Sequence, residues 1–200
     1  MSDAKIVGGR FNLEEVKIEG RVTIRQGDEI LVNNARNHFV DAGLKSIISI
    51  IIFKMVYGNY YNSYYYLPSN SWNIYLGSNT TTPTVTTMTE LMAPIGTAPG
   101  TPPNSKSITS IHDGTPDGDW YAIWQATWNP GTVSGTVGEA ALYMKNSDKN
   151  TFQWEIIGTN YNPPVIMTSR VSSADGDFSS FIINTALPLT VDWKIRWYFS

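Results

Sequence analysis

Apolar and polar residues alternate along most of this chain, which is the two-residue period of a β-strand with one buried face. In residues 14–33 the apolar side chains occupy even positions, among them Val22 and Ile24, and Gly27-Asp28 favours a tight hairpin turn between two strands. The clearest alternation runs from Leu189 to Phe199, where every second residue is large and apolar. The chain is therefore predicted to be mainly β. Further strands are predicted at residues 72–77, 119–128, 137–144, 152–157, 165–171 and 178–183.

One stretch, from Asn37 to Val56, has a helical rather than a two-residue period. Asn37 is a suitable N-cap, because its side chain can accept a hydrogen bond from an amide of the first turn. Several β-branched isoleucines lower the helix propensity and leave a part-strand alternative open. Lys45 and Ser49 favour the helix, since a strand buried on both faces rarely carries polar residues. We expect one main core helix at residues 38–56, too short and interrupted to span a bilayer. The apolar residues at helical spacing are Val40, Leu44, Ile47, Ile48, Ile51 and Met55.

Together these segments predict a single antiparallel β-sandwich of jelly-roll type, with residues 1–200 forming one domain. Residues 78–107 are rich in Thr, Pro, Gly and Ser. Proline lacks the amide donor that a central strand requires, so this segment is expected to be a surface excursion from the domain. In residues 119–128 the tryptophans also lie four apart, so a helix is formally possible there, but the aromatic content favours a strand.

The composition argues against several classes of function. The chain has no cysteine, so disulfides and thiolate metal sites are excluded. Its formal net charge is −3 and only 16% of its residues are charged, so direct nucleic-acid binding is not expected. The N-terminal ten residues show no apolar secretion signal. We therefore expect neither a membrane span nor secretion.

Catalytic motifs are also missing. The two histidines lie in unrelated contexts, and no Ser-His-Asp order, HExxH, GxSxG or glycine-rich phosphate loop is present. We expect no catalytic residue, no cofactor and no enzymatic activity. A hydrolase that uses two carboxylates stays an open alternative, because seventeen acidic residues are available.

Two Asp-Gly loops have a weak resemblance to cation-binding loops. Residues 112–119 and Asp175-Gly176-Asp177 combine carboxylates with tight turns, and hard cations prefer several oxygen ligands. Neither loop has the spacing or the closing bidentate glutamate of a calcium loop, and ordinary turn chemistry explains Asp-Gly pairs equally well. We therefore assign no metal site, and cation binding by these loops stays an open question.

Six of the eleven tyrosines lie between residues 57 and 66, among Asn, Gly and Ser. One interpretation is a structured loop whose rings lie on the sheet. The other is an exposed contact surface, because tyrosine combines a large apolar face with a hydroxyl group and few torsions to restrict. Under the second interpretation the candidate interface residues are Tyr57, Tyr60, Tyr61, Tyr64, Tyr65 and Tyr66.

Along the chain lie the segments GEAALYM, TSRVSS, PLTVDWKIRWYF, NNARNHFVDAGLKSII and IYLGSNTTTPTVTTMTEL. These segments resemble structural proteins of tailed-bacteriophage and archaeal-virus tails and virions. The resemblance implies an oligomeric β-sandwich building block of a tail, neck, nozzle or fibre, located in the virion after synthesis in the host cytoplasm. Its partners would be further copies of itself and other virion proteins. The Tyr-rich stretch and the Pro-rich segment depart from the family pattern.

Glu139 and Arg170 are the charged positions that this resemblance carries over, and both interrupt apolar segments. If their strands pair, the two side chains could form a structural ion pair with bidentate geometry. The alternative is that each faces water. A competing function is a carbohydrate- or receptor-binding module at a tail tip, which would use exposed Tyr and Trp rings as stacking platforms.

Overall fold

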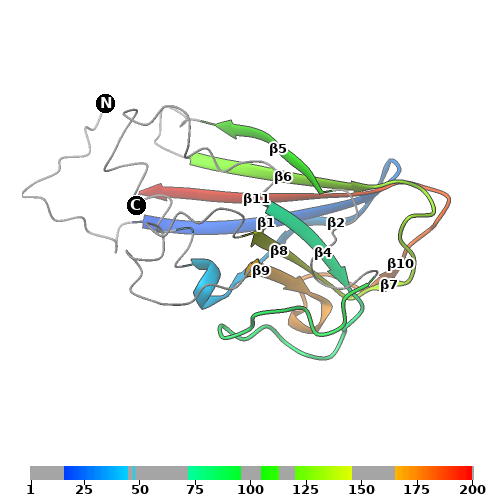
Figure 1. The fold of residues 1–200 in the computed structure, drawn as a ribbon, viewed down its shortest axis with the longest axis horizontal. Helices are drawn as coiled ribbons and strands as arrows, with labels where there is room; N and C mark the ends of the chain where they lie inside the picture. The colour runs from blue at the N-terminus through cyan, green and yellow to red at the C-terminus, as the bar shows by residue number, and fades with distance from the viewer. Residues whose placement is uncertain are drawn as a thin grey trace, which may run out of the picture.

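The protein folds mainly into two antiparallel β-sheets (Figure 1). The computed structural model describes residues 16–44, 47, 72–95, 105–112, 120–145 and 165–199. The larger sheet contains, in spatial order, β2 (Glu29–Arg36), β1 (Val16–Gln26), β11 (Leu189–Phe199), β6 (Trp120–Trp128) and β5 (Ser105–His112). The smaller sheet contains β3 (His38–Phe39), β9 (Val165–Ser172), β8 (Glu139–Lys145) and β4 (Trp72–Gly77). A separate two-stranded sheet pairs β10 (Phe181–Ile182) with β7 (Thr136–Val137).

Four of the strand pairs are nested along the sequence. β1 pairs with β11, β3 with β9, β4 with β8 and β5 with β6, all antiparallel. The outermost pair is the longest of the four, and its register runs without a shift from Val16 opposite Phe199 to Gln26 opposite Leu189. The prediction of a mainly β, antiparallel fold is thus confirmed. Its finer part, a sandwich of jelly-roll type, stays a prediction.

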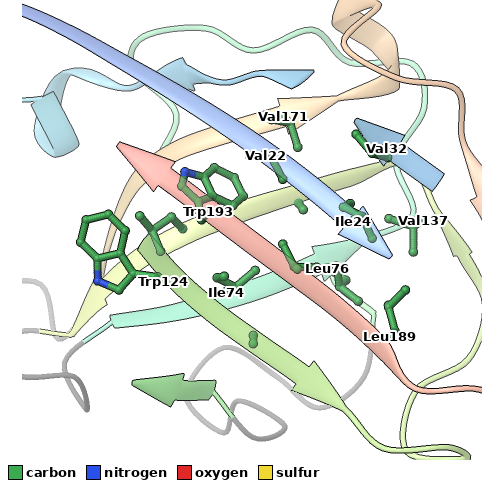
Figure 2. Close-up of a cluster of buried hydrophobic side chains, with 14 of the residues drawn as sticks. Val22, Ile24, Val32, Ile74, Leu76, Trp124, Val137, Val171, Leu189 and Trp193 are labelled. Atoms are coloured by element: carbon green, nitrogen blue, oxygen red, sulfur yellow. The ribbon is translucent and has the colours of Figure 1, made fainter. Parts of the chain in front are cut away.

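Side chains from both sheets form one cluster of buried residues, part of which is drawn in Figure 2. Ile24 and Trp193 come from the larger sheet, and Ile74 comes from the smaller one. The indole rings of Trp72 and Trp124, one from each sheet, pack with their centroids 4.6 Å apart and their planes tilted by 37°. Each large side chain buried in this way stabilises the fold by roughly 1.5–3 kcal/mol. The alternation in β1, β6 and β11 therefore identified the face that is buried.

The smaller sheet is buried on its other face as well. Ala141 and Tyr143 of β8 belong to a second buried cluster, together with Tyr75 of β4 and Leu91. Leu91 lies in residues 78–95, part of the predicted surface excursion, and most residues of this loop are exposed. The loop therefore covers one face of the smaller sheet while its own outer side meets solvent.

The predicted helix begins later than expected. His38-Phe39 forms β3, paired with Ser169 and Arg170 of β9, and the helical residues are 41–44 and 47. The first helical hydrogen bond runs from Leu44 N to Val40 O, at 2.8 Å. The start at residue 38 was therefore wrong, because pairing with β9 takes precedence over helix formation there. The rest of the predicted helix lies outside the described residues.

Asn37 is not the N-cap that the sequence predicted. Its side chain is buried beside β1 and β11, four residues before the helix. With its amide nitrogen facing Gly20, Asn37 donates to Gly20 O at 3.1 Å and accepts from Trp193 Nε1 at 2.6 Å. Gly20 has no side chain, and a Cβ at this position would collide with the Asn37 amide. The Asn37 side chain thus accepts a hydrogen bond from a buried tryptophan, and not from an amide at the start of the helix.

Two predicted strands are shorter or interrupted in the structure. The strand predicted at 178–183 is reduced to Phe181–Ile182, and the one predicted at 137–144 is divided at Gly138. A Cβ at Gly138 would collide with the backbone oxygen of Asn79, so the break occurs where another segment approaches closely. β5 was not predicted. The strand predicted at 152–157 lies outside the described residues.

Replacing Leu142 by alanine tests the core described above. Leu142 of β8 is fully buried, and removing its side chain should lower the free energy of unfolding by about 2–5 kcal/mol, because a cavity remains. Leu187→Ala is the matched control, since that leucine is 42% exposed and its loss should cost within about 0.5 kcal/mol. Urea unfolding measures both. Equal effects of the two substitutions would contradict the assignment of Leu142 to the core.

Candidate functional site

A fully buried ion pair joins Glu139 of β8 to Arg170 of β9. Arg170 Nη2 lies 2.8 Å from Glu139 Oε2, and Arg170 Nε donates to the same oxygen at 2.9 Å. Both side chains have zero exposed area. The structure therefore brings together the two charged residues that the sequence singled out, and their contact uses two guanidinium nitrogens on one carboxylate oxygen.

The strand register explains why these two side chains meet. Arg170 is opposite Ala141 and Glu139 is opposite Ser172, so the pair is diagonal across two adjacent antiparallel strands. Diagonal neighbours lie about 7–8 Å apart at their Cα atoms, which long side chains can span. Gly77 of β4 is opposite Glu139 on the other side, and a Cβ there would collide with the Glu139 carboxylate. A glycine at residue 77 thus provides the space for the buried acid.

The remaining polar atoms of the pair bind the covering loop, residues 78–95. Glu139 Oε1 accepts a hydrogen bond from Ala93 N at 2.9 Å. Arg170 Nη2 donates to Thr82 O at 3.0 Å, and Arg170 Nη1 donates to the Thr84 hydroxyl at 2.8 Å. Every nitrogen of the guanidinium group and both carboxylate oxygens therefore have partners. Such complete satisfaction is what makes a buried ion pair tolerable, since the desolvation of each charge is costly.

Asp175 extends this network to the turn after β9. Ser173–Asp175 forms a 3₁₀ helix, and Gly176 ends it with a positive φ of 77°. The Thr84 hydroxyl donates to Asp175 Oδ2 at 2.6 Å, and Thr84 N donates to Asp175 Oδ1 at 2.9 Å. Because the same hydroxyl accepts from Arg170, Thr84 connects the guanidinium to a second carboxylate. The predicted turn thus holds the covering loop from outside the sheet.

Tyr143 fixes the loop at a further point. Its hydroxyl accepts a hydrogen bond from Leu91 N at 2.8 Å, and its ring packs edge-on against Tyr75 with centroids 4.8 Å apart. Burial raises the pKa of the Tyr143 phenol well above its ordinary value, against the opposing effect of the Leu91 bond. The neutral phenol is therefore the form that the folded protein favours.

The structure also groups His38, Asp175 and Asp177, whose potential ligand atoms lie within 4.8 Å of one another. The carboxylate oxygens are already engaged: Asp177 Oδ1 contacts His38 Nε2 at 3.1 Å and Asp177 Oδ2 accepts from Ser172 N at 2.9 Å. Arg170 Nη1 lies 3.7 Å from Asp175 Oδ2, and its positive charge opposes a second cation there. We therefore interpret this cluster as a hydrogen-bonded link between β3 and the turn after β9. The other candidate loop, after His112, lies outside the described residues.

The sequence did not identify the partners of the ion pair in the loop. These partners are two backbone groups, Thr82 O and Ala93 N, and the hydroxyl of Thr84. No sequence pattern distinguishes such groups from others in the loop. Asp175 was noted only as a turn residue. The candidate interface residues Tyr57, Tyr60, Tyr61, Tyr64, Tyr65 and Tyr66 lie outside the described residues.

Comparison with protein-family models, with curated proteins and with solved structures finds no match to this chain. In the described part of the chain, no helix has the length and apolar character needed to cross a membrane.

Removing either partner of the buried ion pair should destabilise the protein strongly. Glu139→Ala and Arg170→Ala should each lower the free energy of unfolding by about 3–5 kcal/mol, because one charge remains buried without a counter-charge. The double variant should lose less than the sum of the two. Arg25 and Asp192 form the matched control, a partly exposed pair worth about 0–1 kcal/mol. Denaturant unfolding of the full cycle measures these values, and single variants as stable as the wild type would exclude a structural role for the pair.

Tyr143→Phe should weaken the attachment of the loop in a pH-dependent way. At pH 8 the substitution leaves Leu91 N without its partner and should cost about 1–3 kcal/mol. The phenol has a raised pKa in the folded state, so its contribution is present below the ordinary tyrosine pKa of about 10 and is lost as the pH rises further. The stability difference between wild type and Tyr143→Phe should therefore shrink between about pH 9 and pH 11. A difference that stays constant over this range would contradict the buried neutral phenol.

Proposed function

We propose that this protein is a structural subunit of a virion, an oligomeric building block of a tail, neck, nozzle or fibre that performs no catalytic step. It would be made in the host cytoplasm and assembled with copies of itself and with other virion proteins. Two observations support this proposal. Segments of the chain resemble virion proteins, and residues of these segments form buried contacts that hold the fold together.

The observation that carries this proposal is the buried pair of Glu139 and Arg170. Both residues belong to the segments that resemble virion proteins, GEAALYM and TSRVSS, which lie in β8 and β9. Both are fully buried, and their hydrogen-bonding atoms are occupied by one another and by the covering loop. Residues that are used in this way have no atoms left for a substrate. They favour a scaffold over an enzyme.

The proposed architecture is a sandwich in which the two sheets face one another across the shared core. The single cluster of buried residues with members from both sheets supports this arrangement. The nested strand pairs support a jelly-roll-like winding, because they describe one long antiparallel hairpin folded back on itself. A β-sandwich of this kind exposes loops at its ends, where neighbouring subunits can make contact.

The competing function, a glycan- or receptor-binding module, needs aromatic rings at the surface. Four tryptophans with described side chains are instead buried, with exposures of 4% or less. These are Trp72, Trp124, Trp128 and Trp193. They serve the core and cannot act as stacking platforms, so none of these four favours sugar binding.

The size of the purified protein in solution tests the proposal. Light scattering coupled to size-exclusion chromatography should show a ring, a trimer or a larger assembly, and electron microscopy of the peak should show repeating subunits. A monomer that gives a specific signal on a glycan array would overturn the structural role in favour of the binding module. A monomer without such a signal would also contradict self-assembly, and a test against other virion proteins would then follow.

A further inference from the structure

Strand β2 forms one edge of the larger sheet. It pairs with β1 on one side, and no strand among the described residues pairs with its other side. Five of its eight residues are exposed, and one of them is a large apolar residue, Ile30, with 54% of its surface accessible. An edge strand presents unpaired amide and carbonyl groups, which can bond to a strand of another chain. The edge at β2 is therefore open to further strand pairing.

The charges of β2 are separated along its length. Asp28 and Glu29 lie at its start and Arg36 ends it, and all three residues are exposed. Arg36 is directly opposite Arg21 of β1, and like charges in directly opposite positions are destabilising. None of these four residues forms an ion pair with another described residue. The start of β2 thus carries two uncompensated negative charges, and its end lies in a row of two uncompensated positive charges.

A second copy of β2 complements this distribution when it runs antiparallel to the first. The acidic start of each strand then lies beside the basic end of the other, whereas a parallel alignment would bring like charges together. A two-fold axis perpendicular to the sheet, near the middle of β2, produces the antiparallel alignment and makes the favourable contact twice. Each contact brings two acidic residues to the row of Arg21 and Arg36, and so offsets the repulsion within that row.

The irregular middle of β2 restricts which strand can pair with it. Its register with β1 shifts twice, between Val22 and Ile24 and between Ile24 and Arg25, and Asn34 has a positive φ of 53°. Irregularities of this kind hinder a regular strand from pairing along an edge. The two-fold axis places the irregular middle of one copy opposite the same segment of the other, which leaves the two ends free to pair. The edge therefore fits another β2 better than a regular strand.

We infer that two copies of this chain associate through β2, edge to edge and antiparallel, so that their larger sheets continue across a two-fold axis. The contact is isologous, because the same strand is used by both copies, and its product is a dimer from which a larger assembly can be built. Ile30 of each copy loses exposed area in this contact, which adds a hydrophobic contribution to the charge pairing. This inference rests on the self-assembly part of the proposed function and specifies the surface that it uses.

Two charge reversals test the reciprocal contact. Glu29→Lys and Arg36→Glu each place like charges together at both ends of the dimer contact. The self-association of either variant should therefore weaken about tenfold, which corresponds to about 1.4 kcal/mol. Sedimentation velocity at about 0.05 M NaCl measures the dissociation constants, because exposed charges are little screened at low salt.

An equimolar mixture of these two variants should associate about as tightly as the wild type. In the mixed dimer, the lysine introduced by Glu29→Lys lies beside the glutamate introduced by Arg36→Glu, and the other end of the contact keeps its wild-type residues. Recovery in the mixture is thus the result that an antiparallel contact between two β2 strands predicts. It also requires that both variants are folded.

Glu90→Lys is the matched control. Glu90 is exposed in the loop that covers the smaller sheet, and its substitution changes the net charge as Glu29→Lys does. Glu90→Lys should self-associate as the wild type does, and it should bind Arg36→Glu less tightly than Glu29→Lys does. Equal weakening by Glu29→Lys and Glu90→Lys would show an effect of overall charge and overturn the inference.

Urea unfolding at low protein concentration separates the docking role from a structural one. The free energy of unfolding of Glu29→Lys should equal that of the wild type. That of Arg36→Glu should stay equal or rise, because a like-charge contact with Arg21 becomes an opposite-charge contact. Weaker association together with unchanged stability supports docking through β2.

The remaining outcomes separate this inference from the proposed function. If the wild type assembles and both charge reversals assemble equally well, β2 is not the contact and self-assembly stands. If both reversals weaken association and their mixture does not recover it, the contact is not between two β2 strands, and self-assembly again stands. If the wild type is monomeric at every concentration tested, both proposals fail.

Discussion

The buried contact between Glu139 and Arg170 constrains the rest of the smaller sheet. Two charges without access to water must satisfy their hydrogen bonds inside the protein, and here those partners come from β8, β9 and the covering loop. An apolar pair of the same volume could provide comparable stability. The ion pair differs in being directional, because it is satisfied only when Thr82, Thr84 and Ala93 occupy their observed places. We interpret it as the interaction that selects one position of the loop over others.

This constraint explains why a loop rich in proline and threonine can take the place of a third layer. Its backbone does not form a continuous strand, since Pro83 and Pro94 lack donors, and it pairs with β4 through one isolated bridge between Pro94 and Gly77. Instead its polar groups are bound one at a time, by Glu139, Arg170, Asp175 and Tyr143. Leu91 fills the apolar space between these contacts. The loop is thus fixed by side chains of the sheet, and its attachment depends on a few specific groups.

Much of the strand pattern could be predicted from the sequence, because long strands with one buried face keep a strict period of two. β1, β6 and β11 have that period, whereas β8 and β9, which are buried on both faces, were predicted from largely apolar runs. β5 lacks the two-residue period, since register shifts at Lys106/Ile108 and Ile108/Ser110 interrupt its pairing with β6 and hence its alternation. Only part of the candidate site could be predicted from the sequence. A charge inside an apolar segment is visible in sequence, and this singled out Glu139 and Arg170. Their loop partners could not be predicted from the sequence. Those of Arg170 lie more than eighty positions away and are a backbone oxygen and a threonine hydroxyl, which no sequence pattern distinguishes.

The outer faces of the two sheets differ in the side chains that they carry. The smaller sheet places Tyr75, Ala141 and Tyr143 outward and requires a dry cover, which the loop provides. The larger sheet places long basic side chains outward, whose aliphatic stems can shield the strands while their charged ends reach solvent. Its half-exposed residues, such as Lys194 and Arg196, fit this description. The described residues of the larger sheet therefore present charged ends to solvent, where the smaller sheet presents apolar rings to its covering loop.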